Sequence, residues 1–364
     1  MLLEGAAHAL RDYLLKRNNR KLLFISLPLI DQRESRSELY VKGKIKKLGR
    51  VTRKIKIGIF DYIIDSVWVF YNSIRFGKTD LFVGIDPLNA FVGIILKKIG
   101  YAKKVIYYGI DFVPIRFESK IINSLFHFLE AYCVKNSDEV WNVSDRIKEG
   151  RQKFLGLDPK VYHQKTVPIG VYPSSRKRLK KTSKVLFIGH LLKKQGVQKV
   201  IEALPEILKK IPKCKLIVVG GGEYKDALIR KTKQLGISNA VEFKGWIKDK
   251  SELESITFEA DLAVACYVPE KEMLRNFSYY ADPTKIKDYL NAGLPVVMTN
   301  VPHNASDIEN NECGIIVKYE KRSIASAILK LLQDDKKLAF YQKNAVKFMK
   351  KYNWDLIFTK ALNG

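Results

Sequence analysis

The sequence predicts an α/β protein made of two Rossmann-like, doubly wound domains that face a cleft. Apolar, strand-like runs alternate along the chain with amphipathic helical stretches, which is the pattern of a parallel sheet covered by helices. The alternation stops at a short basic segment and then starts again. A length of 364 residues is long for one core and comfortable for two domains.

The first half of the chain carries five strand-like runs with helical patterns between several of them. We expect strands over residues 21–27, 54–59, 81–84, 105–108 and 138–143, and helices over 89–98 and 118–135. These elements predict an N-terminal domain over residues 1–172. Its first residues resemble the glycine loop that follows a first strand, so we expect that strand to be missing.

Residues 173–184 read as a linker, because serines, lysines and arginines replace the apolar pattern there. After it we expect strands over 184–188, 215–219, 240–243, 262–266, 295–298 and 314–317, and a helix over 195–211. They predict a C-terminal domain over residues 185–345. The remaining residues, 346–364, are expected to form a helix that packs back on the N-terminal domain.

The segment from residue 282 to 297 is the most informative one in the chain. Asp282 is a good N-cap residue, Pro283 suits the first helical position, and Gly293 with Pro295 ends the helix before a buried strand. The segment therefore predicts a short helix that leads into a strand. It falls late in a series of strand–helix units, where the carboxyl ends of strands form ligand crevices.

The start of this predicted helix has the chemistry of a phosphate site. Free backbone N–H groups and the helix dipole favour an anion there, and Thr284 and Lys285 add a hydroxyl and a positive charge. Asp288 lies one turn later, where its carboxylate could accept sugar hydroxyls. The pattern favours a nucleotide-diphosphate site, while an ordinary amphipathic helix with solvated lysines remains the alternative.

The charge is strongly positive, with 65 Lys and Arg against 38 Asp and Glu and a net charge of +27. Such a field attracts anions. The densest basic run covers residues 33–56, includes Lys44, Lys46, Lys47 and Arg50, and is interleaved with apolar residues. This mixture suits an anionic membrane surface or a solvated basic loop. Nucleic acid is less expected, since no zinc finger, RNA-recognition signature or basic zipper is present.

The remaining composition predicts a protein on the inner face of the membrane. Cys133, Cys214, Cys266 and Cys313 are scattered without a Cys-x-x-Cys pair, which fits buried thiols in a reducing cytosol. No signal peptide is evident, and the most apolar window is too short to span a bilayer. We therefore expect a cytoplasmic protein that is peripheral on the membrane.

Several short motifs follow one another in a specific order. They are Trp141-Asn142-Val143-Ser144, the run 185–190 with Gln195-Gly196-Val197, the glycines at 220–222, the run 241–246 and the segment 282–297. On these motifs the chain from residue 103 to 354 resembles the GT-B glycosyltransferases of family 4, which use nucleotide sugars. The resemblance implies transfer of a hexosyl unit to a glycan or lipid-linked saccharide, with retention of configuration, in surface polysaccharide or glycoconjugate biosynthesis.

The resemblance also implies roles for individual residues. The expected donor-binding set is Gly189, His190, Lys194, Gln195, Gly221, Gly245, Trp246, Asp282, Thr284, Lys285 and Asp288. Asp111 and Lys285 are the expected catalytic residues, and Arg116 is a candidate for the acceptor. The chain departs from the family at four of its motif positions, where His190 replaces Arg, Gln195 replaces Lys, Tyr280 replaces Glu and Ile110 replaces His.

The mechanism must be rebuilt from what the chain contains. It has no Asp-x-Asp, so no metal is expected, and the leaving diphosphate should be stabilised by Lys285 and helix N-terminal amides. No cofactor is expected beyond the nucleotide sugar as substrate. A sugar-nucleotide epimerase of the same fold and a non-catalytic basic scaffold or nucleic-acid-binding protein remain alternatives.

Overall fold

The computed structural model describes residues 5–17, 21–28, 34–52, 60–173, 181–269, 274–275 and 277–363, without the side chains of Phe60 and Phe277. The chain divides into two compact units. The N-terminal unit contains Glu4–Pro168 and Phe358–Gly364, and the C-terminal unit is built on Ile169–Ile357.

A parallel four-stranded sheet forms the centre of the N-terminal unit. Its strands β4 (Thr79–Ile85), β5 (Ala102–Gly109), β6 (Glu139–Asn142) and β7 (Gln164–Thr166) lie in sequence order. The helices are α2 (Phe60–Phe76), α3 (Pro87–Lys98), α4 (Lys120–Asn136) and α5 (Asp145–Leu155). The strands predicted over 81–84, 105–108 and 138–143 are confirmed, and so are both predicted helices.

The strand predicted over residues 21–27 is present, but it does not belong to the parallel sheet as expected. Strand β1 (Lys21–Ser26) pairs antiparallel with β2 (Glu34–Val41), which pairs antiparallel with β3 (Lys44–Thr52). Lys42 and Gly43 both have positive φ, as a tight hairpin turn requires. The described part of the basic run is thus a hairpin, and the solvated-loop interpretation is wrong for it. Arg33 and the strand predicted over 54–59 lie outside the described residues.

The two ends of the chain meet in the N-terminal unit. Helices α1 (Ala6–Lys16) and α14 (Trp354–Asn363) are joined by a 3.0 Å hydrogen bond between the Tyr13 hydroxyl and Thr359 Oγ1. The Phe358 ring contacts the rings of Tyr13 and Trp141, with centroids 5.5 and 6.5 Å away. The aromatic contacts bind the last helix to the core beneath β6.

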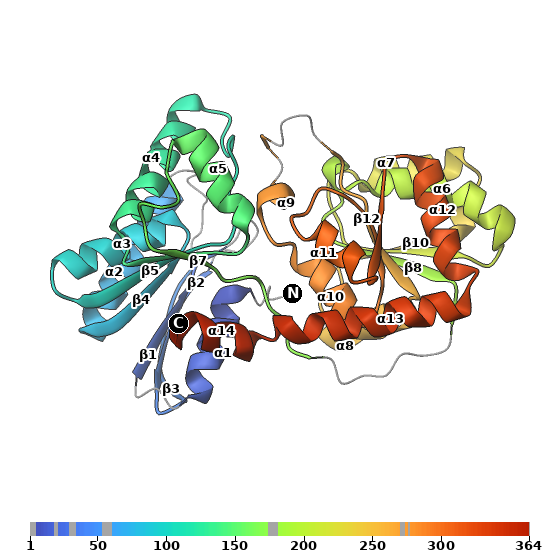
Figure 1. Ribbon diagram of the computed structural model, residues 1–364. Helices are drawn as coiled ribbons and strands as arrows, with labels where there is room; N and C mark the ends of the chain where they lie inside the picture. The colour runs from blue at the N-terminus through green and yellow to red at the C-terminus, as the bar shows by residue number, and fades with distance from the viewer. Residues whose placement is uncertain are drawn as a thin grey trace. The chain divides into compact units, whose positions relative to one another are not determined.

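The C-terminal unit is a six-stranded parallel sheet between layers of helices (Figure 1). Its strands are β8 (Lys184–Ile188), β9 (Lys215–Val219), β10 (Val241–Gly245), β11 (Leu262–Ala265), β12 (Val296–Thr299) and β13 (Gly314–Val317). Its helices are α6 (Val197–Lys210), α7 (Lys225–Gln234), α8 (Lys250–Glu259), α9 (Phe277–Tyr280), α10 (Thr284–Asn291), α11 (Ala305–Asn310), α12 (Lys321–Leu332) and α13 (Asp335–Met349). All six predicted strands are confirmed.

The strand order of this sheet is β10-β9-β8-β11-β12-β13. The chain therefore winds outward in one direction from β8 and in the other direction from β11. The middle strands are buried on both faces, which explains why they read as continuous apolar runs. The place where the direction changes, between β8 and β11, is a topological switch point.

Most of the predicted linker, residues 174–180, lies outside the described residues. Among the helices that the structure describes, none has the length and apolarity needed to cross a bilayer.

Candidate functional site

The switch point of the C-terminal unit collects side chains from three parts of the chain. Gly189 follows β8, Tyr267 follows β11, and Lys285 stands in the first turn of α10. A Cβ built on Gly189 would lie 3.4 Å from the Lys285 ammonium, so that ammonium sits at the carboxyl end of β8. This is where open α/β sheets bind their ligands.

Lys285 is held by a neutral side chain and two aromatic rings. Its Nζ donates to Gln195 Oε1 at 2.5 Å and lies 4.6 Å from the ring centroids of both Phe187 and Tyr267. No carboxylate among the described residues forms an ion pair with it. Burial among these groups lowers the pKa of Lys285 to about 7. The ammonium therefore lacks a counter-charge and would gain from a bound anion.

Gln195 owes its position to the turn between β8 and α6. A short 3₁₀ turn, Lys193–Gln195, ends at Gly196, whose φ of 77° is left-handed. A Cβ on Gly196 would lie 1.6 Å from the Cys266 carbonyl oxygen, so only glycine fits there. The close approach of this turn to the end of β11 places Gln195 beside Lys285. Lys194 is in the same turn and is half-buried.

The prediction that Asp282 caps α10 is wrong. The helix starts at Thr284, its N-cap residue is Pro283, and no side chain caps it. Asp282 Oδ2 instead accepts the backbone N–H of Ile169 at 2.9 Å and forms a buried ion pair with Lys287. Thr284 is exposed at the first turn, as the phosphate interpretation requires.

The buried pair of Asp282 and Lys287 joins α10 to the start of the C-terminal unit. Lys287 also donates to the Ile169 carbonyl and lies 3.9 Å from the Tyr352 ring centroid. Burial by itself raises the pKa of Asp282. The charge of Lys287 and the His303 ring, whose Nε2 lies 3.2 Å from Asp282 Oδ1, have the larger combined effect and lower that pKa. Asp282 is therefore a structural carboxylate in this unit, two residues before the exposed Thr284.

The glycines after β9 pack against the loop after β8. Gly220 donates its N–H to the Gly245 carbonyl at 2.7 Å, and a Cβ on Gly220 would lie 2.0 Å from the Gly189 carbonyl oxygen. A Cβ on Gly221 would meet the Trp246 indole nitrogen at 2.4 Å. These predicted glycines build the floor of the site by allowing backbones to approach closely.

An aromatic edge borders this floor. The rings of His190 and Trp246 meet edge to face with centroids 4.7 Å apart, and Trp246 is 55% exposed. An exposed indole beside a glycine loop offers a surface for a flat base. Asp288 lies one turn beyond Thr284 in α10 at an exposed position, and partial desolvation of its carboxyl raises the pKa of Asp288 to about 6.

Tyr289 was not predicted, although it fixes α10 to the end of β8. Its hydroxyl accepts the Ile188 N–H at 2.5 Å and lies 3.3 Å from the Ile188 carbonyl oxygen. The sequence offered one signal, because Tyr289 is one turn after Lys285 on the buried side of an amphipathic helix. Phe187 and Tyr267 were missed for another reason, since they are ordinary residues at strand ends.

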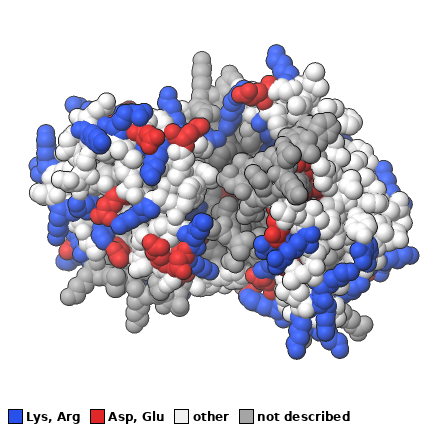
Figure 2. Space-filling view, turned by 180° about the vertical axis from the view of Figure 1, so that it is seen from behind, with Lys and Arg blue, Asp and Glu red and all other residues white. Residues whose placement is uncertain are grey.

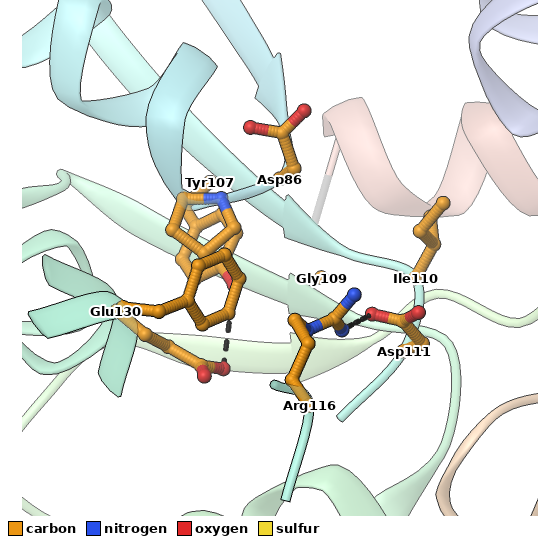
Figure 3. A pocket seen from close by; sticks show the side chains of 9 residues that line it. Asp86, Tyr107, Gly109, Ile110, Asp111, Arg116 and Glu130 are labelled. Atoms are coloured by element: carbon orange, nitrogen blue, oxygen red, sulfur yellow. Dashed lines mark hydrogen bonds and ion pairs between the residues drawn. The ribbon is translucent and has the colours of Figure 1, made fainter. Parts of the chain in front are cut away.

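A second group of polar residues lies in the N-terminal unit at the end of β5. Asp111 pairs with the Nη2 of Arg116, so the predicted catalytic acid and the acceptor candidate touch each other (Figure 3). They line a recess of about 20 Å³ together with Asp86, Tyr107 and Glu130. The space is that of about one water molecule, so a larger acceptor would rest against the recess and not enter it.

Asp86 is a further residue of this recess that sequence reasoning did not select. It caps α3 by accepting the Asn89 N–H at 2.9 Å, and its φ of 104° is strained for a residue other than glycine. Burial raises the pKa of Asp86 to about 6, with a smaller contribution from Asp111. The Asp-Pro pair at residues 86–87 was a helix-start signal that could have identified it.

The predicted residues thus form three separate groups. Gly189, Gln195 and Lys285 meet at the switch point, and His190, Gly221, Gly245 and Trp246 form its neighbouring floor and edge. Asp111 and Arg116 lie in the N-terminal unit. Lys44, Lys46, Lys47 and Arg50 are exposed on β3 of that same unit.

Comparison with known proteins identifies the C-terminal unit first. Residues 172–348 match the model of the glycosyl transferases group 1 family. The C-terminal unit is therefore similar to the glycosyl transferases group 1 family over most of its length. An uncharacterized glycosyltransferase of Methanocaldococcus jannaschii is 31% identical over 182 residues, which is 49% of this chain and 43% of that relative. The chain thus spans less than half the length of that curated relative.

Solved structures show the same fold. Sucrose-phosphate synthase from Thermosynechococcus elongatus has a TM-score of 0.66 at 17% identity, covering 86% of this chain and 82% of that one. The HepE protein of Anabaena, solved in complex with UDP, has a TM-score of 0.64 at 18% identity, with 82% and 80% covered. The predicted GT-B fold is confirmed.

Proposed function

We propose that this chain transfers a hexosyl unit from a nucleotide-diphosphate sugar to a glycan or lipid-linked saccharide. The observation that carries the proposal is the Lys285 ammonium, which stands at the switch point of the C-terminal unit without an acidic partner among the described residues. The match of residues 172–348 to the glycosyl transferases group 1 family supports the reaction class. The UDP complex of the Anabaena protein supports a nucleotide diphosphate as the ligand.

In this proposal the diphosphate lies over Gly189 and the start of α10. Lys285 supplies a full charge, Thr284 a hydroxyl, and the first amides of α10 supply hydrogen-bond donors that no helix carbonyl uses. The nucleotide base lies against the edge made by His190 and Trp246. Asp288 accepts hydroxyls of the ribose.

Catalysis then consists mainly of electrostatic stabilisation of the leaving diphosphate. Charge grows on the diphosphate as the glycosidic bond to the sugar breaks, and a fixed, partly buried lysine stabilises that charge more than solvent would. We infer no metal for this step, because the sequence has no Asp-x-Asp. Retention of configuration belongs to the proposal through the family resemblance.

The acceptor side of the proposal rests on Asp111. Arg116 holds this carboxylate at the carboxyl end of β5, and the position suits a group that accepts a hydrogen bond from an acceptor hydroxyl (Figure 3). Arg116 keeps an Nε–H without a partner among the described residues, so the pair can also donate to a ligand. We propose a role in surface polysaccharide or glycoconjugate biosynthesis at the cytoplasmic face of the membrane.

A ligand screen tests this function most broadly. UDP-, GDP- and ADP-sugars are compared by thermal shift, since a ligand at a hundred times its Kd stabilises the fold by about 2.7 kcal/mol. The donor found in this way is then incubated with the protein, and release of the nucleoside diphosphate is followed by chromatography. Stabilisation by one donor class with release supports the proposal. Failure of every nucleotide sugar to stabilise the protein would contradict it.

A further inference from the structure

Helix α2 carries apolar residues both on the side that it buries and on a side that it exposes. One face packs into the core of the N-terminal unit through Val69, which is 4% exposed, and through Phe70 and Ile74. The other face carries Ile63, Ile64, Val67 and Tyr71, which are 58, 41, 62 and 50% exposed. Their spacing of one, three and four residues places them in one stripe along the helix. An outer helix face is normally polar, so this stripe calls for a covering partner.

A groove lies beside the stripe, between α2 and the end of β3. It encloses about 240 Å³ and is lined by Ile64, Val67, Trp68 and Tyr71 of α2 together with Val51 and Ser35 of the hairpin. The Ser35 hydroxyl bonds Asp65 at 3.2 Å and holds the two elements together. The groove walls are almost entirely hydrocarbon and aromatic, which is the environment that a hydrocarbon chain prefers.

One polar group of the groove lacks a partner. The Trp68 indole N–H is buried and donates to no described residue. A buried donor of this kind costs free energy unless a ligand or water accepts from it. An occupant that is apolar along most of its length and carries an oxygen near one end would satisfy it.

The surroundings of the groove are basic. The exposed Lys44, Lys46, Lys47 and Arg50 belong to β3, and the exposed Arg75 lies in the last turn of α2. Figure 2 draws one face of the molecule, where more of the described surface is blue (Lys and Arg) than red (Asp and Glu). A second copy of the chain would bring the same positive charge to this face and would be repelled. Nucleic acid would leave the apolar stripe uncovered.

We propose that the α2–β3 face docks on an anionic lipid bilayer and takes one hydrocarbon chain of a lipid into the groove. The basic residues meet phosphate headgroups, the stripe enters the interface, and an oxygen of the lipid accepts from Trp68. For the transferase this places the enzyme where lipid-linked acceptors lie. That last step rests on the proposed function, whereas docking itself does not.

Vesicle sedimentation tests the charge component. The protein is mixed with phosphatidylcholine vesicles with or without 30% phosphatidylglycerol, at low and at high salt. We expect pelleting only with the anionic vesicles and less of it at high salt. Each lysine or arginine near the surface should contribute roughly five-fold in affinity, so replacing Lys44, Lys46, Lys47 and Arg50 by Gln should weaken binding more than a hundred-fold. Unchanged pelleting of this variant would overturn the proposal.

A second pair of variants tests the apolar component. Ile63→Ser with Val67→Ser removes the centre of the stripe and should weaken vesicle binding by more than ten-fold. The matched control is Phe340→Ser with Val346→Ser on α13 of the C-terminal unit, where both side chains are 47% exposed. The control should bind like the parent. Circular dichroism and nucleotide-diphosphate affinity should be unchanged in both variants, which separates failure of docking from failure of the proposed function.

Insertion into the groove has its own signal. Lipids brominated along the acyl chain should quench the fluorescence of the parent, and Trp68→Phe should remove that quenching while the protein still pellets. Three results would overturn the proposal: unchanged binding of the stripe variant, a parent dimer in light scattering that the stripe variant abolishes, or binding that depends instead on the exposed Ile121, Leu125 and Phe128 of α4.

Discussion

The Lys285 ammonium lies 2.5 Å from Gln195 Oε1, although the two residues are 90 positions apart in the chain. Related family members usually have a lysine where Gln195 stands. A second ammonium so close to Lys285 would repel it, whereas the amide oxygen of Gln195 accepts a hydrogen bond from it. Of the described groups that contact Gln195, the Lys285 ammonium is the cation with a lowered pKa, so we expect it to dominate the response of the site to pH and to mutation.

The first prediction concerns pH. The pKa of Lys285 is about 7 in the free protein because of burial, and a bound diphosphate stabilises the charged form and raises that pKa. Binding is then coupled to proton uptake above pH 7. We expect nucleoside-diphosphate affinity to fall about ten-fold per pH unit above pH 7, measured by calorimetry, until the pKa of the complex is reached.

Arginine at the same place provides the control. It cannot lose its proton in this range, so Lys285→Arg should give an affinity that is nearly flat between pH 7 and 9. If the affinity of the parent and of Lys285→Arg fell in parallel with rising pH, a group other than Lys285 would be responsible for the pH dependence.

The second prediction concerns metal. If Lys285 and the amides of α10 carry the diphosphate, turnover of the donor should persist in excess EDTA at about the untreated rate. Nucleoside-diphosphate release is the measurement. A loss of rate that magnesium or manganese restores would show that a metal carries this charge.

The third prediction concerns the turn that places Gln195. Gly196→Ala puts a Cβ into the Cys266 carbonyl and should cost about 3 kcal/mol or more, with loss of nucleotide binding. Gly236→Ala is the matched control, because Gly236 has φ 67° but open space around it. It should cost about 1–2 kcal/mol and leave binding intact, as judged by urea unfolding. Equal losses of stability in the two variants would mean that the left-handed backbone conformation causes the loss and that the clash with the Cys266 carbonyl does not.

The fourth prediction concerns the buried pair beneath α10. Lys287→Met leaves the Asp282 carboxylate buried without its cation and should cost about 3–5 kcal/mol. Lys199→Met breaks the half-exposed pair with Glu202 and should cost less than about 1 kcal/mol. Adding Asp282→Leu to Lys287→Met should recover part of the stability. If the double variant unfolds no later than the single one, the pair does not explain the loss.

The middle strands of the C-terminal unit could be predicted from the sequence because both of their faces are buried, so they are continuous apolar runs such as Leu262–Ala265. The sheet to which β1 belongs could not be predicted from the sequence. Its partner β2 reads as Glu-Ser-Arg-Ser-Glu-Leu-Tyr-Val, which gives little strand signal, and it turned a supposed parallel strand into part of an antiparallel sheet.

The candidate site was predictable to the extent that it depends on local chemistry. Lys285 was found because a helix start beside a strand end is a local pattern. Asp282 was misread because its true partners are Lys287 and the Ile169 backbone, the latter 113 residues away. The rings of Phe187 and Tyr267 come together only through the pairing of β8 with β11. Contacts between distant strands decide such details, and a single sequence does not display them.

The central claim is that Lys285 binds the diphosphate of the donor. Calorimetry with a nucleoside diphosphate and with the matching nucleoside, on the parent and on Lys285→Met, tests it most directly, with Lys209→Met on the exposed end of α6 as the control. A charge-assisted hydrogen bond is worth about 1.5–3 kcal/mol, so the variant should bind the diphosphate about 10–100 times more weakly. Nucleoside affinity should not change. Equal diphosphate affinity of parent and Lys285→Met would contradict the account.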